Sequence, residues 1–307
     1  MSNSPHETST PPEPAGHGTT GPGATRPHAQ RPGPEPQVAA SLVPEEGWHF
    51  LHLFYRIDRA RLTDMPASRR ERGVEELRRA LAERPSGGPE QLQCLAIPGH
   101  KANLGVVMAG PDIKGVHAVQ TAIESSILGA ALVPTYAFYS ITEISEYVPN
   151  AEEYGRILRE REALDPESSI YQTKVNAYAE RLGPMNRQRL YPEFPSWPCL
   201  CFYPMSKARA ESHNWYMLPF EARSELMSAH ARSGMKFAGK VSQLITASTG
   251  LDDWEWGVTL WSRNPSYLKD IVYTMRFDES SARYGLFGDF YFGYILPPDE
   301  LLKTLRI

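Results

Sequence analysis

The feature that most constrains the fold is a pattern of secondary structure that occurs twice along the chain. In each half, apolar strand and helix patterns follow the order β-α-β-β-α-β. This order is typical of the ferredoxin-like unit, and two units of about 100–110 residues would place their sheets against one another. The sequence therefore predicts an α+β fold, a duplicated ferredoxin-like barrel of the dimeric α+β type. The predicted strands cover 48–57, 91–97, 104–108, 135–144, 197–205, 237–247, 254–261 and 287–295.

Local signals place the predicted helices between these strands. Ser68-x-x-Glu71 reads as a capping box that opens a helix with Val74, Leu77 and Leu81 on one face. In the second half, a helix over 220–232 is predicted to stop at Gly234, and another begins at Pro265. We expect a first half over 45–160, a connecting helical segment over 161–188 and a second half over 189–307. Residues 1–44, rich in proline and glycine, are predicted to form a disordered tail.

Composition excludes several classes of protein. The net charge of −4 lacks the basic footprint of a nucleic-acid binder. Three cysteines without CxxC spacing argue against a disulfide framework and a zinc site. Neither a signal peptide nor a membrane span is visible, because the longest uncharged stretch, 125–142, is interrupted by proline and polar residues. We expect a cytoplasmic protein.

The strand over 197–205 carries the first candidate site residues. Alternate side chains share a face of a strand, so Tyr203 and Lys207 point the same way, roughly 13 Å apart at Cα. A long lysine could close that gap. The alternative is an ordinary strand end at which the lysine turns into solvent.

Two further polar residues occupy positions that read as buried. Gln243 shares strand parity with Val241 and Ile245, so its amide needs a partner, either the backbone or a small ligand that it could orient but not deprotonate. Arg276 follows Val272 by one helical turn, and a buried guanidinium requires an anion. Asp278, Glu279 or a ligand carboxylate could supply it.

A histidine in the predicted helix over 220–232 is the candidate metal ligand. His230 continues the stripe of Ala222 and Leu226, which aims its ring at the sheet. It is either a core histidine or an axial ligand of haem iron, since haem brings four nitrogens of its own. No second ligand lies at metal-binding spacing. Asp252, Asp253 and Glu255 read as a solvated turn rather than a metal site.

Several motifs in one order resemble those of the coproheme decarboxylases in the chlorite dismutase superfamily. The resemblance covers about 46–307 and is densest from 187 onward. The runs that carry it are Tyr203-Pro204-Met205-Ser206-Lys207, Asn214-Trp215-Tyr216-Met217-Leu218-Pro219, His230, Gly250-Leu251-Asp252-Asp253-Trp254-Glu255-Trp256-Gly257 and Tyr273-Thr274-Met275-Arg276-Phe277-Asp278-Glu279-Ser280-Ser281-Ala282-Arg283-Tyr284.

The resemblance implies one haem site per chain, in the second half, because the corresponding helix of the first half ends at 82–85 without a histidine. By motif, His230 is similar to the proximal iron ligand and Tyr203 to the redox-active tyrosine. Gln243 falls at the distal position, and Trp215 is also expected to contact the cofactor. The groups expected to hold the porphyrin propionates are Lys207, Arg189, Arg276 and Ser281.

The implied reaction is oxidative decarboxylation of two propionates of Fe-coproporphyrin III (coproheme) by hydrogen peroxide. The propionates become vinyl groups through a tyrosyl radical, and haem b is the product, so the porphyrin is both cofactor and substrate. A homopentamer is implied, with coproporphyrin ferrochelatase as a candidate partner that delivers coproheme.

Two differences from the motifs of other family members indicate which type of decarboxylase the chain resembles. Chlorite-degrading members carry a distal arginine where this chain has Gln243, and actinobacterial decarboxylases carry a distal histidine that the stretch over 185–189 lacks. The chain therefore looks like the Firmicutes type. The alternatives are a chlorite dismutase or weak haem peroxidase, and, from another class, a haem carrier or sensor without turnover.

Overall fold

The computed structural model describes residues 40–85 and 87–307, so most of the predicted tail over 1–44 lies outside the described residues. Residues 41–307 form one compact unit. The first half contains β1 (His49–Ile57), α1 (Arg59–Asp64), α2 (Ala67–Ala82), β2 (Gln91–Ala96), β3 (Leu104–Gly110), α3 (Ile113–Ser125), the 3-10 helix η1 (Ile127–Ala131) and β4 (Leu132–Thr142).

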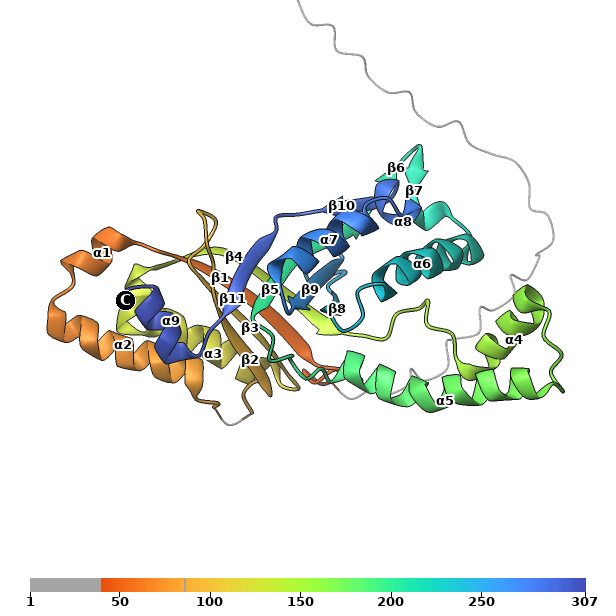
Figure 1. The fold of residues 1–307 in the computed structure, drawn as a ribbon. Coiled ribbons are helices and arrows are strands. Elements are labelled where there is room, and N and C mark those ends of the chain that lie inside the picture. Colours follow the sequence, from red (N-terminus) through yellow and green to blue (C-terminus); the bar gives the residue numbers. More distant parts are fainter. Residues whose placement is uncertain (1–39, 86) are drawn as a thin grey trace, which may run out of the picture. The chain divides into compact units, whose positions relative to one another are not determined.

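The second half repeats this order after a helical connection (Figure 1). The connection consists of α4 (Ala151–Glu162) and α5 (Ser169–Leu190). The second half contains β5 (Cys199–Lys207), β6 (Arg209–Ala210), β7 (His213–Asn214), η2 (Trp215–Met217), α6 (Phe220–Met235), β8 (Val241–Ala247), β9 (Trp256–Ser262), α7 (Pro265–Met275), α8 (Glu279–Ala282), β10 (Gly285–Phe287), β11 (Tyr291–Ile295) and α9 (Pro298–Thr304).

The strands of the two halves form one closed antiparallel barrel. Within the first half the order is β4-β1-β3-β2, and within the second half it is β11-β5-β9-β8. Pairing of β11 with β2 and of β4 with β8 joins the halves at both edges. These two orders are the same ferredoxin-like arrangement, so the predicted α+β duplicated fold is confirmed.

The barrel interior is apolar and rich in aromatic rings from both halves. Phe54 stacks on Tyr291 with ring centroids 4.1 Å apart, and Phe202 stacks on His52 at 3.9 Å. His52 is fully buried, so burial lowers its pKa to about 3, and one ring nitrogen pairs with the Thr259 hydroxyl at 2.9 Å. The interior is therefore a packed core rather than a ligand site.

Outside the barrel, the helices of the first half pack closely on their strands. Leu77 and Leu81 of α2 and Val119 of α3 are buried against the outward side of β1 and β3, and α9 covers the same cluster (Figure 1). The predicted apolar stripe of α2 is confirmed. The Ser68–Glu71 capping box is wrong, because α2 begins at Ala67 after Pro66 and Ser68 already lies within the helix.

Four sequence-predicted boundaries in the second half are wrong. Helix α6 runs through Gly234 to Met235, and the turn that follows, with Gly239 at φ +75°, delays the next strand to Val241. The predicted strand over 287–295 is two strands, because the chain leaves the β5 edge after Phe287 and returns to it at Tyr291. Residue Trp254 precedes β9 rather than opening it.

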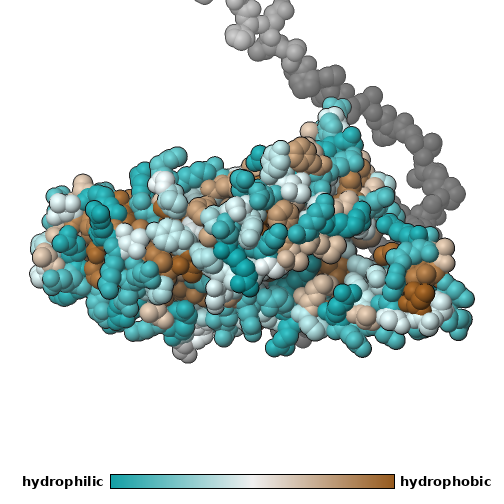
Figure 2. All heavy atoms as spheres, viewed as in Figure 1, coloured by the Kyte–Doolittle hydropathy of each residue, from teal (hydrophilic) through white to brown (hydrophobic). Residues whose placement is uncertain are grey.

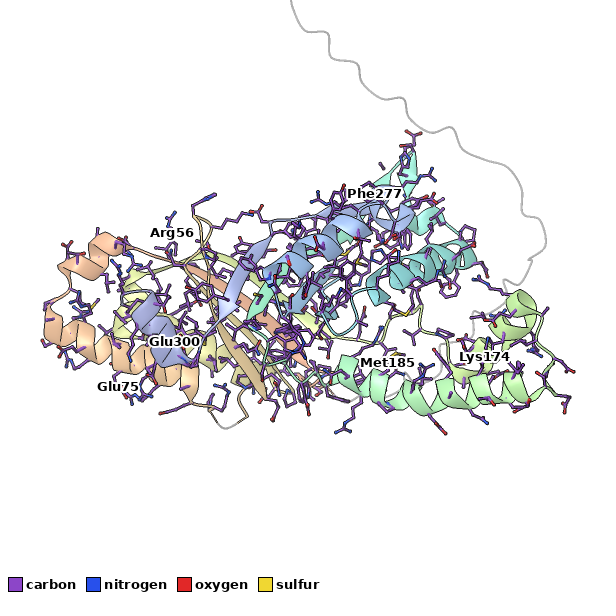
Figure 3. All side chains as sticks on the ribbon, in the orientation of Figure 1. Arg56, Glu75, Lys174, Met185, Phe277 and Glu300 are labelled. Carbon is purple, nitrogen blue, oxygen red and sulfur yellow. The ribbon has the colours of Figure 1, made fainter. Side chains whose placement is uncertain are left out.

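The connection between the halves is a pair of helices with mostly exposed side chains. A capping box of Asn150 and Glu153 starts α4, and α5 contains Pro184 in its interior. Met185 and Lys174 project from α5 in Figure 3. Among residues 40–85 and 87–307, no helix has the length and apolar character needed to cross a membrane.

Candidate functional site

A cavity of about 950 Å³ lies in the second half, bordered by the outward faces of β5, β8 and β9, by α6 and α7, by the segment 143–148 before α4, and by the last turn of α5. Figure 2 shows hydrophobic side chains recessed between α6 and the α4–α5 pair. The volume is in the range of a cofactor pocket. All eight residues selected from the sequence line it, namely Arg189, Tyr203, Lys207, Trp215, His230, Gln243, Arg276 and Ser281.

The cavity exists because α6 stands away from the sheet. None of its described residues is fully buried, and its side that lines the cavity carries Met227, Ser228, His230, Ala231, Gly234 and Met235. His230 is on that face, with about one fifth of its side chain exposed. The ring therefore has the direction predicted from the i, i+4 spacing, but it faces a cavity rather than a core.

One nitrogen of His230 is held by a carboxylate. Nδ1 lies 3.0 Å from an oxygen of Asp278, which also accepts a hydrogen bond from the Ser233 hydroxyl at 2.7 Å. Burial lowers the pKa of His230, while Asp278 acts in the opposite direction. The Asp278 carboxylate favours the proton on Nδ1, and Nε2 remains as the nitrogen for a metal.

A single histidine cannot form a closed metal site. Among the described residues, no group of three or more His, Cys, Asp or Glu side chains could hold a metal ion. A metal at His230 must therefore bring its other ligands with it, as the iron of a porphyrin does.

Tyr203 and Lys207 share one face of β5, as predicted. The Tyr203 ring stacks on Phe290 at 4.3 Å, and burial raises the pKa of its phenol, with the nearby Arg276 opposing the shift. The Lys207 ammonium donates to the Ser280 carbonyl at 3.0 Å and lies 4.2 Å from the centre of the Trp215 ring. The alternative in which Lys207 turns into solvent is wrong.

Burial also affects the proton affinity of Lys207, whose exposed fraction is 7 %. Desolvation lowers the pKa of its ammonium to about 8, and the charge of Glu255 partly opposes that effect. A buried amine that titrates near neutral pH can hold or release a proton under ordinary conditions.

The prediction that Arg276 is buried is wrong, and the alternative in which Asp278 or Glu279 pairs with it is also wrong. Arg276 is exposed at the end of α7, and it has no ion-pair partner among the described residues. Asp278 binds His230 instead, and Glu279 pairs with Arg283 at 2.7 Å. The helix ends at Met275, so the periodicity that placed Arg276 on the buried stripe stops one residue before it.

Gln243 faces the same cavity. Its strand parity was predicted correctly, but the residue is exposed to the opening and has no hydrogen-bond partner among the described residues. The alternative of a core glutamine bonded to the backbone is therefore wrong. Strand alternation shows which face of β8 carries Gln243. Whether that face is solvated depends on the distance between α6 and the sheet.

Three cationic groups border the cavity, and none of them directly contacts a carboxylate of residues 40–85 or 87–307. Lys207, Arg189 and Arg276 come from β5, the last turn of α5 and the end of α7, which are distant in sequence. Burial lowers the pKa of Arg189, consistent with a guanidinium held partly out of water. Such an arrangement suits a ligand that carries several carboxylates.

Sequence reasoning missed two carboxylates near the site. Glu143 lines the cavity directly after β4, and burial raises the pKa of its carboxyl group. Glu255 was predicted to be solvated together with Asp252 and Asp253, but only 5 % of it is exposed. The register signal for Glu143 was available, because it continues the alternation of β4 by one residue beyond Thr142.

Comparison with known proteins identifies the family. The family model described as chlorite dismutase matches residues 70–296. The chain is 38 % identical over 269 residues to the coproheme decarboxylase of Staphylococcus saprophyticus, covering 87 % of this chain and 97 % of the relative. It is 38 % identical over 276 residues to the coproheme decarboxylase of Staphylococcus carnosus, covering 88 % and 99 %.

Solved structures agree with this result. A heme-binding protein from Thermus thermophilus is 37 % identical, with a TM-score of 0.70 over 85 % of this chain and 96 % of that one. A mutant chlorite dismutase from Candidatus Nitrospira defluvii, at 19 % identity and a TM-score of 0.64 over 86 % and 97 %, shares the fold. With a family model that spans most of the chain and relatives matched along nearly their whole length, this protein belongs to the chlorite dismutase family.

Proposed function

We propose that this protein is a coproheme decarboxylase, which converts Fe-coproporphyrin III and hydrogen peroxide to haem b by removing carbon dioxide from two propionates. The two staphylococcal relatives of that name support the reaction. The observation that carries the proposal is the cavity itself, in which His230, Tyr203 and three cations face one space.

The residues present fit an iron porphyrin. His230 offers one imidazole nitrogen and is anchored through the other by Asp278. Lys207, Arg189 and Arg276 would hold propionates, with Ser281 as a hydroxyl donor, and Trp215 and the apolar wall would contact the macrocycle. Gln243 would face the opposite side of the ring from His230.

When bound, the iron porphyrin would supply the redox chemistry through which peroxide accepts two electrons. Tyr203 would then give up an electron and its phenolic proton, and its radical would take a hydrogen atom from the β-carbon of a propionate. Loss of a second electron from that carbon would accompany departure of carbon dioxide and leave the vinyl group. Each round consumes one propionate, one peroxide and one proton, and it yields one vinyl group, one carbon dioxide and two waters. Because burial raises the pKa of the phenol, Tyr203 is protonated at neutral pH, and its oxidation requires a proton acceptor.

Lys207 is the group best placed to exchange that proton or to neutralise the reacting carboxylate. It shares the outward face of β5 with Tyr203, and its pKa of about 8 lies close to neutral pH. Gln243 cannot act as a general base because an amide does not titrate in this range.

The two alternative functions are a chlorite dismutase or weak haem peroxidase, and a haem carrier or sensor. An amide at Gln243 offers no positive charge for an oxychlorine anion, which speaks against chlorite dismutation. A haem carrier or sensor would bind the same ligand without turnover.

We also propose a cytoplasmic homopentamer that receives coproheme from coproporphyrin ferrochelatase. Light scattering of the purified protein tests whether it forms a ring of five.

Mass spectrometry of the bound porphyrin tests the proposed reaction. Peroxide added to the coproheme complex should produce two successive losses of about 46 Da each, the mass of carbon dioxide plus two hydrogens. Tyr203→Phe should stop both losses and leave binding largely unchanged. A carrier would show no loss in the wild-type protein.

Tyr55→Phe is a matched control. Tyr55 lies on the outward side of β1 as Tyr203 does on β5, but its hydroxyl donates to Glu124 at 3.0 Å, away from the cavity. This variant should decarboxylate at the wild-type rate. Undiminished decarboxylation in Tyr203→Phe would remove Tyr203 from the mechanism.

A further inference from the structure

Glu255 is a buried carboxylate that the proposed chemistry does not use. It lies directly before β9, and only 5 % of it is exposed. A buried carboxylate is costly unless it is fully paired. Its partners therefore indicate what its burial achieves.

The carboxylate of Glu255 joins the end of β5 to the segment that follows it. One oxygen accepts the backbone N–H of Lys207 at 2.8 Å, and the other accepts the guanidinium of Arg209. The Glu255 backbone N–H donates to the Met205 carbonyl at 3.2 Å and to the Ser206 hydroxyl at 3.1 Å. Side chain and backbone together fix the last three residues of β5.

The segment held in this way is a small hairpin over 208–216, built from β6, β7 and the first two residues of η2. Arg209 pairs with Asn214 across the hairpin, and the Trp215 N–H donates to the Ala208 carbonyl at 2.9 Å. The Arg209 guanidinium lies 5.0 Å from the centre of the Tyr216 ring. The hairpin thus returns Trp215 to a position 4.2 Å from the Lys207 ammonium.

We propose that Glu255 is a positioning residue for Lys207 and Trp215, acting through the 208–216 hairpin. This inference rests on the proposed function for its importance to catalysis, but its structural part does not. Glu255 binds both the backbone of Lys207 and the side chain of Arg209. It thereby holds the Trp215 ring, which lines the cavity, next to the Lys207 ammonium.

Glu255 also contributes a charge. Among the groups around Lys207, Glu255 raises the pKa of its ammonium, whereas burial lowers it. His230 on α6 faces Lys207 from across the cavity, and Arg209 on the hairpin is the nearby cation bound to the same carboxylate. Burial and Glu255 also raise the pKa of the Tyr216 phenol, which remains neutral.

Hydrogen–deuterium exchange of the full chain without porphyrin tests the hairpin directly. Glu255→Gln removes the charge-assisted bond to Arg209, so the amides of 208–216 should exchange about tenfold faster. Asp253→Asn is the matched control, because Asp253 lies in the same loop and is exposed. Equal exchange of the hairpin in Glu255→Gln and in the wild type would overturn the proposal.

The titration of Lys207 separates positioning from a merely structural role. In protein labelled with 13C-lysine, with the signal assigned by its loss in Lys207→Met, Glu255→Gln should lower the midpoint by about one pH unit. Arg209→Gln removes a cation from the same carboxylate and should raise the midpoint. A midpoint that stays the same in both variants would overturn the proposal.

These measurements use protein without porphyrin, so they remain valid if the proposed decarboxylation fails. With coproheme, the high-pH limit of decarboxylation should move in the same direction as the Lys207 midpoint. If Glu255→Gln does not fold, Arg209→Gln carries the test, since its side chain is 65 % exposed. A fall in rate without movement of the profile would leave Glu255 as a structural residue and contradict the assignment.

Discussion

The two halves share one topology and differ in how far a helix lies from its sheet. Helices α2 and α6 both contain 16 residues. The eleventh residue is Leu77 in α2, fully buried, and His230 in α6, which faces a cavity. The fifteenth is Leu81 in α2, 1 % exposed, and Gly234 in α6.

This difference shows how a duplicated fold acquires a single site. In the first half, the apolar stripe of α2 packs against the sheet. In the second half, α6 has no buried residue, and the space between α6 and the sheet is not filled by its side chains. Helix α7 still packs through Leu268 and Ile271, so the fold of the second half is retained. Glu75 on α2 and Glu300 on α9 mark the packed end in Figure 3, well separated from Phe277 beyond α7.

The largest expected effect comes from making α6 resemble α2 at the eleventh position. His230→Leu removes the imidazole, and coproheme should bind roughly 100-fold more weakly or worse, since even an indirect partner of a metal site can be worth 10–100-fold. Titration followed by Soret absorbance measures this. His117→Gln, at an exposed histidine of α3, is the control and should bind normally.

Wild-type affinity in His230→Leu would show that another group holds the iron. The change in the Soret spectrum separates loss of the ligand from loss of the fold, which circular dichroism checks independently.

Next in size is the loss of packing in the first half. Leu77→Ala creates a cavity at a fully buried position and should lower the free energy of unfolding by about 2–5 kcal/mol. Leu226→Ala in α6, at a partly exposed position, should cost only about 1 kcal/mol. Urea unfolding of the protein without porphyrin measures both values. Equal costs would mean that α6 packs as closely as α2.

The last prediction concerns the pH dependence of stability and the buried lysine of the second half. Burial holds the pKa of folded Lys207 at about 8, below its value in the unfolded chain, so the unfolded chain binds more protons between these two pH values. Stability should therefore rise as pH increases from 8 toward 10, by up to about 3 kcal/mol. Below pH 8 the lysine is charged in both states, so the folded protein bears the full free-energy cost of burying the ammonium.

Lys207→Met should lack this rise, and the difference between its unfolding curve and that of the wild type isolates Lys207 from other titrating groups. Parallel curves across this range would mean that Lys207 keeps an ordinary proton affinity in the folded protein.

The sequence determined which residues share a face. Period-2 alternation placed Tyr203 and Lys207 together, the i, i+4 stripe aimed His230 at the sheet, and the order of elements gave the duplicated topology. Periodicity encodes these results because it is a property of the local backbone. It failed at Arg276, one residue after α7 ends.

Only the tertiary structure decided what lies opposite each face. Gln243 and Leu244 are neighbours on β8, yet Gln243 is exposed, whereas Leu244 is 6 % exposed and packs in the barrel core. Glu255 is buried because β5 and the 208–216 hairpin bring an N–H and a guanidinium to it from about 50 residues away, a pairing that no local pattern contains. Distances between elements depend on packing of the whole chain. The cavity forms because α6 lies away from the sheet, and this separation cannot be predicted from a local pattern.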